Sequence, residues 1–360
     1  MVRPAHFGVE GGPALSKPTQ LGYRMPAEWE PHAGTWITWP RREGISFPGL
    51  YDRIPPVLAA VVRVLAAEEG VFINVWDHAM EAEIRTVLEA HDALNDQVEF
   101  YHHRAYEPWC RDHGPVFVLN DRDRAIINWD YNAWGEKYPP YDLDNAIPRQ
   151  IAQARGLPCF TPGMVLEGGS IEVNGTGTLL TTESCLLHPN RNPSLDQDAI
   201  EVQLMENLGV QQILWLGEGI VGDDTDGHID DITRFVDRHT VVTCIEPDPA
   251  DPNHAPLQAN LERLQSMQTE DGTPLQIIEL PMPGPVLHEN ERLPASYANF
   301  YIGNRSVILP TFRHPHDEQA KEILQNCFPE RQVIGIDSTD LVWGLGSFHC
   351  LTQQEPVGRL

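Results

Sequence analysis

The order of predicted secondary structure repeats along this chain, and that repeat constrains the fold more than any other feature. Residues 167–217 show the unit best. Two strands of alternating polarity flank the turn Asn174-Gly175, a dipeptide typical of β-hairpins. The segment DQDAIEVQLMENLG then predicts an amphipathic helix, and the apolar run QILWLG predicts a third strand. One unit is therefore a hairpin followed by a helix and a strand.

The same order recurs in the other parts of the chain. The first unit contains an extra helix and strand at 81–103, and its missing hairpin partner is expected at 349–354, which would close a ring. The five predicted units cover residues 34–77 with 349–354, 114–162, 167–217, 232–281 and 299–337.

Five such units predict one α/β domain over residues 1–360, with pseudo-fivefold symmetry around a central active-site cavity. No single unit can bury its own apolar faces, so the units must pack on one another. Residues 1–21 are expected to form an extended N-terminal segment. The competing interpretation is a doubly wound parallel sheet in two domains. Hairpins that alternate with helices favour the first interpretation, and no GxGxxG or Walker loop supports a nucleotide-binding sheet.

The charge balance argues against two classes of partner. The chain has 52 Asp and Glu against 25 Lys and Arg, a net charge of −27, which repels nucleic acid and anionic membranes and attracts small cations. The N-terminus lacks the apolar stretch of a signal peptide, and no run approaches the roughly 18 apolar residues of a membrane helix. The six cysteines are scattered without a CxxC pair, which is typical of reduced thiols. These features predict a cytoplasmic protein.

Polar residues gather in the segments that lead into the predicted hairpins, called the lead-in segments below. They are residues 109–112, 167–170, 226–230 and 347–350. If the units are related by symmetry, these segments meet at one axis. They would then bring one cysteine, one histidine and three carboxylates into a single cavity: Cys350, His228, Asp112, Asp230 and Glu167. Such a set offers a nucleophile, a proton shuttle and carboxylates that can pair with a planar guanidinium.

Each of these residues also has a purely structural interpretation. Cys350 could be an ordinary core cysteine, although the glycine-containing loop 344–346 before it favours close backbone approach to a site. Asp112 and Asp230 could cap hairpin turns. His228 stands in an acidic run, whose carboxylates favour the charged imidazolium that proton transfer near neutral pH requires.

A metal site is not expected. The acidic run 222–227 fails an EF-hand alignment, because Gly222 and Thr233 would occupy the first and twelfth ligand positions. The chain contains no HExxH motif and no paired-cysteine zinc spacing. The histidine pairs at 102–103 and 314–316 are interpreted as solvated surface.

Beyond these patterns, the chain resembles the agmatine deiminases, which belong with the bacterial-type peptidylarginine deiminases in the guanidine-modifying superfamily. The resemblance runs in collinear order from residue 22 to 357. The strings that carry it are MPAEWEPHAGTWITWP, RDHGPVFV, EGGSIEVNGTGTLLTTESCLL, NRNP, GDDTDGHIDDITRFVD, ASYANFYIGNRSVILPTF and FHCLTQQEP. It implies a five-bladed α/β propeller, no metal, no organic cofactor, and a homo-oligomer, for which we expect a dimer.

The resemblance also implies a role for each site residue. Cys350 would attack the guanidinium carbon, and the covalent amidino-thioether would then be hydrolysed to N-carbamoylputrescine after ammonia leaves. The other implied roles are His228 as general acid and base, Asp112 and Asp230 as the guanidinium clamp, Glu167 as a support for His228 and the substrate, and Trp109 as a pocket wall.

Agmatine is the expected substrate because it carries a second cation. Free arginine has a carboxylate that needs a basic partner, and Arg111 is the only basic residue in the site motifs. Agmatine has an ammonium group instead, for which Asp224 is a candidate contact. Leu345 and Phe348 depart from the glycines and asparagine that family members often have before His-Cys, which affects the pocket over the distal substrate end. The alternatives are a deiminase of free or peptidyl arginine that yields citrulline, a cysteine protease, and a non-enzymatic acidic binding module.

Overall fold

The strands within residues 16–358 form six small sheets. The computed structural model describes residues 16–358. Five of the six sheets share one plan, in which an antiparallel pair is extended by a strand that runs parallel to its second member. The sixth is a short hairpin, β13 (Leu287–His288) and β14 (Glu291–Arg292). The doubly wound interpretation is therefore wrong, because no sheet in residues 16–358 exceeds four strands.

The first unit joins the two ends of the described chain. Its antiparallel pair is formed by β1 and the C-terminal strand β18, with Trp36 opposite Gln353, which confirms the predicted closing strand. It also contains the predicted additional helix and strand, so that its sheet has the order β18-β1-β2-β3. The elements of this unit are β1 (His32–Thr38), α1 (Ile54–Leu65), β2 (Gly70–Asn74), α2 (His78–Ala90), β3 (Val98–Tyr101) and β18 (Thr352–Pro356).

The other units confirm the predicted order of hairpin, helix and parallel strand. Their elements are β4 (Val116–Leu119), β5 (Arg124–Ile127), α5 (Asp142–Arg155) and β6 (Cys159–Phe160); β7 (Glu172–Val173), β8 (Thr178–Thr182), α7 (Gln197–Leu208) and β9 (Gln212–Leu216); β10 (Thr233–Phe235), β11 (Thr240–Ile245), α8 (His254–Leu264) and β12 (Gln276–Pro281); and β15 (Tyr301–Ile302), β16 (Ser306–Thr311), α9 (His316–Cys327) and β17 (Gln332–Asp337). Shorter helices outside this plan are η1 (Pro18–Leu21), η2 (Tyr51–Arg53), α4 (Ala133–Glu136), α6 (Glu183–Leu186) and η5 (Val342–Gly344).

The N-terminal segment is only partly described. Residues 1–15 of the expected extended stretch lie outside the described residues. Within the rest, η1 is a helical turn that packs against α7, where the Thr19 hydroxyl donates a hydrogen bond of 2.9 Å to the Glu206 carbonyl. This part of the segment is therefore not extended.

The predicted Asn-Gly turn in the third unit is stabilised by one side chain. The Asn174 Oδ1 atom accepts hydrogen bonds from the backbone N–H groups of Thr176, Gly177 and Thr178 at 3.0, 3.1 and 2.9 Å. Gly175 has a φ of 75°, a left-handed conformation that glycine adopts without steric cost. Local sequence thus fixes the hairpin and the register of the strands that follow.

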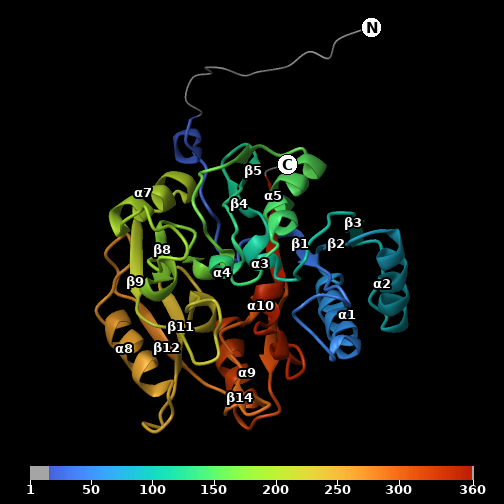
Figure 1. The fold of residues 1–360 in the computed structure, drawn as a ribbon. Helices are drawn as coiled ribbons and strands as arrows, with labels where there is room; N and C mark the ends of the chain where they lie inside the picture. The colour runs from blue at the N-terminus through green and yellow to red at the C-terminus, as the bar shows by residue number, and fades with distance from the viewer. Residues whose placement is uncertain (1–15, 359–360) are drawn as a thin grey trace.

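Helices cover the outer side of the sheets (Figure 1). Helix α1 buries Leu58, Val62 and Leu65, which are spaced along one face, as the helical period requires. Strand β8 is buried along its whole length, as expected of a strand covered on both faces. No helix in residues 16–358 has the length and apolarity that spanning a membrane would require.

The core also contains a buried charge network around Arg234 of β10. The Arg234 side chain is fully buried; its Nε atom donates to Glu172 Oε2 at 2.9 Å, and Nη2 lies 3.1 Å from Glu28 Oε1. Its Nη1 atom donates to the carbonyls of Ala298 and Phe300 at 3.1 and 2.7 Å. A buried charge is tolerated only with such partners. The contacts between the N-terminal segment and the third, fourth and fifth units therefore depend on this one guanidinium.

Replacement of Arg234 by methionine should therefore lower the free energy of unfolding by about 3–5 kcal/mol, because Glu28 and Glu172 lose a buried countercharge. Urea unfolding followed by circular dichroism measures this change. The matched control is Arg238→Met in the same hairpin, where the Arg238 side chain is 49% exposed and pairs with Glu270. That change should cost at most about 1 kcal/mol. Equal effects of the two substitutions would contradict the role of the Arg234 network.

Candidate active site

The lead-in segments fold into single helical turns that meet in the interior. They are α3 (Cys110–His113), η3 (Gly168–Ser170), η4 (Ile229–Asp231) and α10 (Phe348–Leu351). Helix α3 packs against both α10 and η3, and η3 packs against η4. Figure 1 shows α3 and α10 near the centre of the view, inside the longer helices. The predicted site residues of four separate sequence segments are thereby brought together.

Cys350 lies in α10 with only 5% of its surface exposed. Its Sγ atom is 3.1 Å from Asn299 Nδ2 and 3.8 Å from Asp230 Oδ2. Burial, together with the nearby carboxylates of Asp230, Asp231 and Asp112, raises the pKa of the Cys350 thiol well above its usual value. The surroundings of Cys350 therefore favour the protonated thiol, and a cation close to the sulfur would favour the thiolate.

His228 stands immediately before η4 and is completely buried. Its Nδ1 atom lies 3.6 Å from Asp112 Oδ1 and 4.0 Å from Asp230 Oδ1. Burial alone would lower the pKa of His228, but Asp112, the Cys185 thiol and Asp230 raise it well above the usual value. Neither ring nitrogen has a hydrogen-bond partner within hydrogen-bonding geometry among the described residues. The surrounding groups thus favour the protonated ring, which is the form that a proton donor requires.

The two clamp candidates have different environments. Asp112 accepts hydrogen bonds from the Trp134 indole N–H at 2.9 Å and from the Gly169 backbone N–H at 3.0 Å, and burial raises its pKa to about 6. Asp230 Oδ2 lies 2.6 Å from His349 Nδ1, and although burial opposes the shift, His349 lowers the pKa of Asp230. The Asp230 Oδ1 atom has no partner among the described residues. Asp230 therefore holds a negative charge beside the Cys350 sulfur.

Glu167 lies beside His228, but its carboxylate accepts a hydrogen bond from Arg191 rather than from His228. Its Oε1 atom accepts a bond of 2.6 Å from Arg191 Nε, whereas Oε2 is unpartnered among the described residues. Glu167, Cys185 and His228 each offer one atom within 4.8 Å of the others, which is the spacing of a metal-binding group. The fixed Arg191 cation already pairs with this group and opposes a second cation there.

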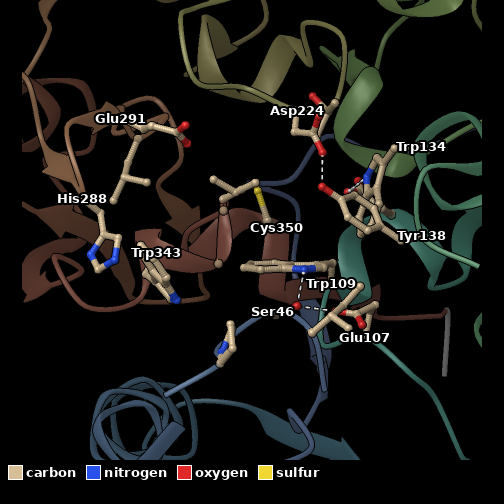
Figure 2. Close-up of a pocket in the computed structure, with 18 of the residues that line it drawn as sticks. Ser46, Glu107, Trp109, Trp134, Tyr138, Asp224, His288, Glu291, Trp343 and Cys350 are labelled. Atoms are coloured by element: carbon tan, nitrogen blue, oxygen red, sulfur yellow. Dashed lines mark hydrogen bonds between the residues drawn. The ribbon is translucent and has the colours of Figure 1, made fainter. Parts of the chain in front are cut away.

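A cavity of about 370 Å³ leads to Cys350. Figure 2 shows Cys350 near the centre of the side chains that line it, with the ring of Trp109 close by. Of the predicted residues, Trp109, Asp112, Asp224 and Cys350 line the cavity, whereas the more deeply buried His228, Asp230 and Glu167 do not. The acidic lining residues are Glu107, Asp112, Asp224, Glu289 and Glu291, and neither lysine nor arginine is among the lining residues.

Asp224 is held at the wall of this cavity by two neighbours. Its carboxylate accepts a hydrogen bond from the Tyr138 hydroxyl, as Figure 2 shows, and lies 3.5 Å from Lys137 Nζ. The Lys137 ammonium also donates to Asp226 at 3.0 Å. Asp224 is thus fixed at the acidic wall of the cavity, and its contact with a distal cation remains a prediction.

The loop before Cys350 only partly matches the expectation. Leu345 lines the cavity, but Phe348 is fully buried in the core, so it does not shape the pocket directly. A Cβ atom on Gly346 would lie 2.5 Å from the Trp109 ring, and one on Gly344 would lie 2.9 Å from it. The two glycines therefore allow the backbone to pack on the Trp109 ring, which is the close approach that the sequence predicted.

Sequence reasoning missed three residues of the site. Asn299 donates to Cys350 Sγ, and its Oδ1 atom accepts the His349 backbone N–H at 3.0 Å. The residue precedes β15, at the position in the fifth unit that corresponds to the four lead-in segments, so this position could have revealed it. His349 lies in the lead-in segment 347–350 beside Cys350, whereas Glu28 has no comparable signal. The Glu28 carboxylate lies 2.8 Å from His349 Nε2 across 321 residues of sequence.

Comparison with known proteins identifies the family to which this chain is similar. The family described as Porphyromonas-type peptidyl-arginine deiminase matches residues 24–356. The agmatine deiminase of Stutzerimonas stutzeri is 37% identical over 371 residues, covering 95% of this chain and 98% of the relative. The structure of Enterococcus faecalis agmatine deiminase has a TM-score of 0.89 and 31% identity, covering 95% of this chain and 98% of that one.

A second solved structure, C. jejuni agmatine deiminase with substrate bound, has a TM-score of 0.85 and 30% identity, with 93% of this chain and 97% of that chain covered. The similarity therefore spans nearly the whole length in both sequence and structure. The chain belongs to the Porphyromonas-type peptidyl-arginine deiminase family.

Proposed function

We propose that this protein is an agmatine deiminase, which hydrolyses agmatine to N-carbamoylputrescine and ammonia. The observation that carries the proposal is the cavity that leads to Cys350, where five acidic side chains and neither lysine nor arginine are found among the lining residues. Such a cavity suits a substrate with a cation at each end. Relatives with 37% identity over almost the full length bear the name agmatine deiminase.

The distal end of the substrate distinguishes agmatine from arginine. An arginine carboxylate would need a basic partner, and Arg111 is directed elsewhere: its Nη1 donates to Gln354 at 2.7 Å and its Nη2 to Glu28 at 3.2 Å. Lys137 is paired with Asp224 and Asp226. An ammonium group would instead meet Asp224 and the acidic side chains of the β13–β14 hairpin. The name of the family, Porphyromonas-type peptidyl-arginine deiminase, favours peptidyl arginine as the second candidate substrate.

The reaction begins when the guanidinium carbon is placed against Cys350. The approaching cation offsets the carboxylates that hold the thiol protonated, so the thiol releases its proton to solvent water and the thiolate adds to the carbon. Asp112 and Asp230 pair with the N–H groups of the guanidinium and keep it in place. The charged His228 then donates a proton to the leaving nitrogen, the C–N bond breaks and ammonia departs.

The second half of the reaction releases the ureido product. An amidino-thioether remains on Cys350, and His228, now neutral, accepts a proton from the attacking water. The C–S bond breaks and the product keeps the oxygen of the water. The proton that the remaining O–H group releases as the ureido C=O forms restores the thiol. Glu167 lies beside His228 with a free carboxylate oxygen and supports the ring during both proton transfers.

The finer architecture is also a proposal. We infer that the five similar sheets are blades of an α/β propeller with approximate fivefold symmetry, in one domain over residues 1–360. The shared strand order and the meeting of the lead-in segments support this arrangement. The expected homodimer and the cytoplasmic location remain predictions.

Ammonia release from agmatine, free arginine and a blocked arginyl peptide tests the substrate, and a preference for either arginine compound would overturn the proposal.

Replacement of Cys350 by serine should abolish turnover but retain agmatine binding, because a hydroxyl is a far weaker nucleophile than a thiolate. Ammonia release measures turnover, and calorimetry measures binding. The control is Cys244→Ser, since Cys244 is a buried cysteine of β11 outside the cavity. This variant should remain active. Turnover of Cys350→Ser within tenfold of the parent would remove Cys350 from the nucleophile role.

Replacement of Asp112 or Asp230 by asparagine should lower kcat/KM by about tenfold to a hundredfold, because a hydrogen bond to a charged group contributes about 1.5–3 kcal/mol. The kcat value should fall as well, since both acids hold the reacting carbon in place. The double variant should lose less than the sum, because the two acids share one ligand.

The control for the clamp is Asp144→Asn. Asp144 is buried outside the cavity, and burial raises its pKa to about 8, so it is already mostly neutral at pH 7. This variant should keep kcat/KM near the parental value. Clamp variants that deiminate agmatine as fast as Asp144→Asn would show that the clamp is misplaced.

Activity should survive exhaustive dialysis against EDTA, because the proposed steps use only side chains and water. Steady-state ammonia release before and after dialysis measures this. Loss of activity that one specific divalent ion restores would contradict the metal-free mechanism and direct attention to Glu167, Cys185 and His228.

A further inference from the structure

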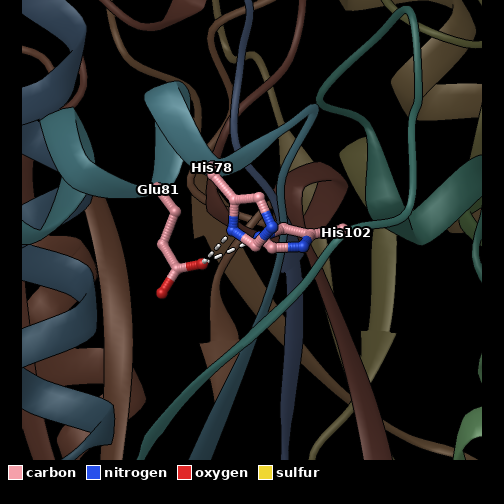
Figure 3. Close-up of side chains that lie close together, drawn as sticks. All are labelled: His78, Glu81 and His102. Carbon is pink, nitrogen blue, oxygen red and sulfur yellow. Dashed lines mark hydrogen bonds and ion pairs between the residues drawn. The ribbon is translucent and has the colours of Figure 1, made fainter.

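A second group of potential metal ligands lies outside the active site. His78 is the first residue of α2, and Glu81 follows it by one helical turn, so both side chains are on one face of the helix. His102 comes directly after Tyr101, the last residue of β3. Figure 3 shows the two imidazole rings and the carboxylate converging from these two elements. Helix α2 and strand β3 are the elements that the other four similar sheets lack.

The three side chains already have distances close to those of a chelate. Glu81 Oε2 lies 2.8 Å from His102 Nε2 and 4.0 Å from His78 Nδ1, and the two ring centroids are 4.0 Å apart. One atom from each residue falls within 4.8 Å of the other two. Tetrahedral zinc with bonds of 2.0–2.1 Å separates its ligand atoms by roughly 3.3 Å. Small rotations of exposed side chains would reach that geometry.

We propose that His78, Glu81 and His102 form a binding site for a divalent transition metal of the zinc, cobalt and nickel class. Two imidazole nitrogens and one carboxylate oxygen are ligands that these ions prefer. The His78 side chain is 89% exposed and that of His102 is 36% exposed, so water completes the coordination and the ion exchanges with solvent. The site goes beyond the proposed deimination and does not depend on it.

A neighbouring arginine orients the carboxylate ligand. Arg85 Nε donates to Glu81 Oε1 at 2.9 Å, which leaves Oε2 directed at the two histidines. The Arg85 guanidinium itself rests 4.4 Å from the centroid of the Phe100 ring. Burial opposes ionisation of Glu81, but the hydrogen bonds of Arg85 and His102 lower its pKa. A hydrogen bond of this kind to the other oxygen of a carboxylate fixes the ligand oxygen in its binding orientation.

Two features oppose a cation here and limit the affinity. Arg85 is positively charged, and the N-terminus of α2 carries a partial positive charge close to His78. Protonated imidazoles must also lose a proton before they bind metal. These costs predict an exchangeable site rather than a structural one. The protein should therefore fold without the ion.

Zinc titration of the full-length chain after removal of metal by EDTA tests the proposal. Isothermal calorimetry should record one equivalent of zinc that is absent from the His78→Ala, His102→Ala double variant. Glu81→Gln, which keeps the shape but removes the charge, should weaken this binding by at least about tenfold. Agmatine deimination by these variants should equal that of the parent, since none of the three residues lines the cavity at Cys350.

The matched control is a second histidine pair. The rings of His314 and His316 are 4.7 Å apart, but this pair belongs to no three-ligand group in the described part of the chain. The His314→Ala, His316→Ala variant should bind zinc as the parent does. The proposal is overturned if the His78, His102 double variant keeps the parental stoichiometry and affinity, or if the control variant loses the same equivalent.

Discussion

The structure depends on one buried carboxylate, that of Glu28. Its oxygens lie 3.2 Å from Arg111 Nη2, 3.1 Å from Arg234 Nη2 and 2.8 Å from His349 Nε2, and it also accepts the Ile302 backbone N–H at 2.8 Å. These partners come from four different sheets or the turns that lead into them. Burial disfavours a charge at this position, yet the surrounding cations lower the pKa of Glu28 well below its usual range. The carboxylate therefore stays ionised and stabilises the contacts between the units at the centre.

The same network extends to the proposed active site. His349 bridges Glu28 and Asp230, with distances of 2.8 and 2.6 Å from its two ring nitrogens. The Asp230 carboxylate then faces the sulfur of Cys350. A buried polar network is stable only when its members are satisfied, so the fold constrains where the charge at Asp230 can lie. The same set of side chains thus stabilises the centre and positions Asp230, one of the two carboxylates of the proposed guanidinium clamp.

The electrostatics of the site favour a cationic ligand. The nearby carboxylates keep the Cys350 thiol protonated and the His228 ring charged in the free protein. In the proposed reaction, a guanidinium would supply the missing positive charge beside the sulfur, so that substrate binding itself would activate the thiol. Such a thiol would stay unreactive towards neutral compounds, which would make a buried acidic cavity compatible with the proposed nucleophile.

The sequence by itself determined the local elements and their order. Periodicity and turn chemistry act over a few residues, so the hairpins, the helices and the closing strand at 352–356 were predictable, as were the segments that hold Cys350, His228 and Asp112. Only the tertiary structure decided which charges meet. The partnership of Glu28 with His349, the hydrogen bond of Asn299 to Cys350 and the pairing of Glu167 with Arg191 join distant segments. No local pattern encodes such pairs, because long-range packing brings them together.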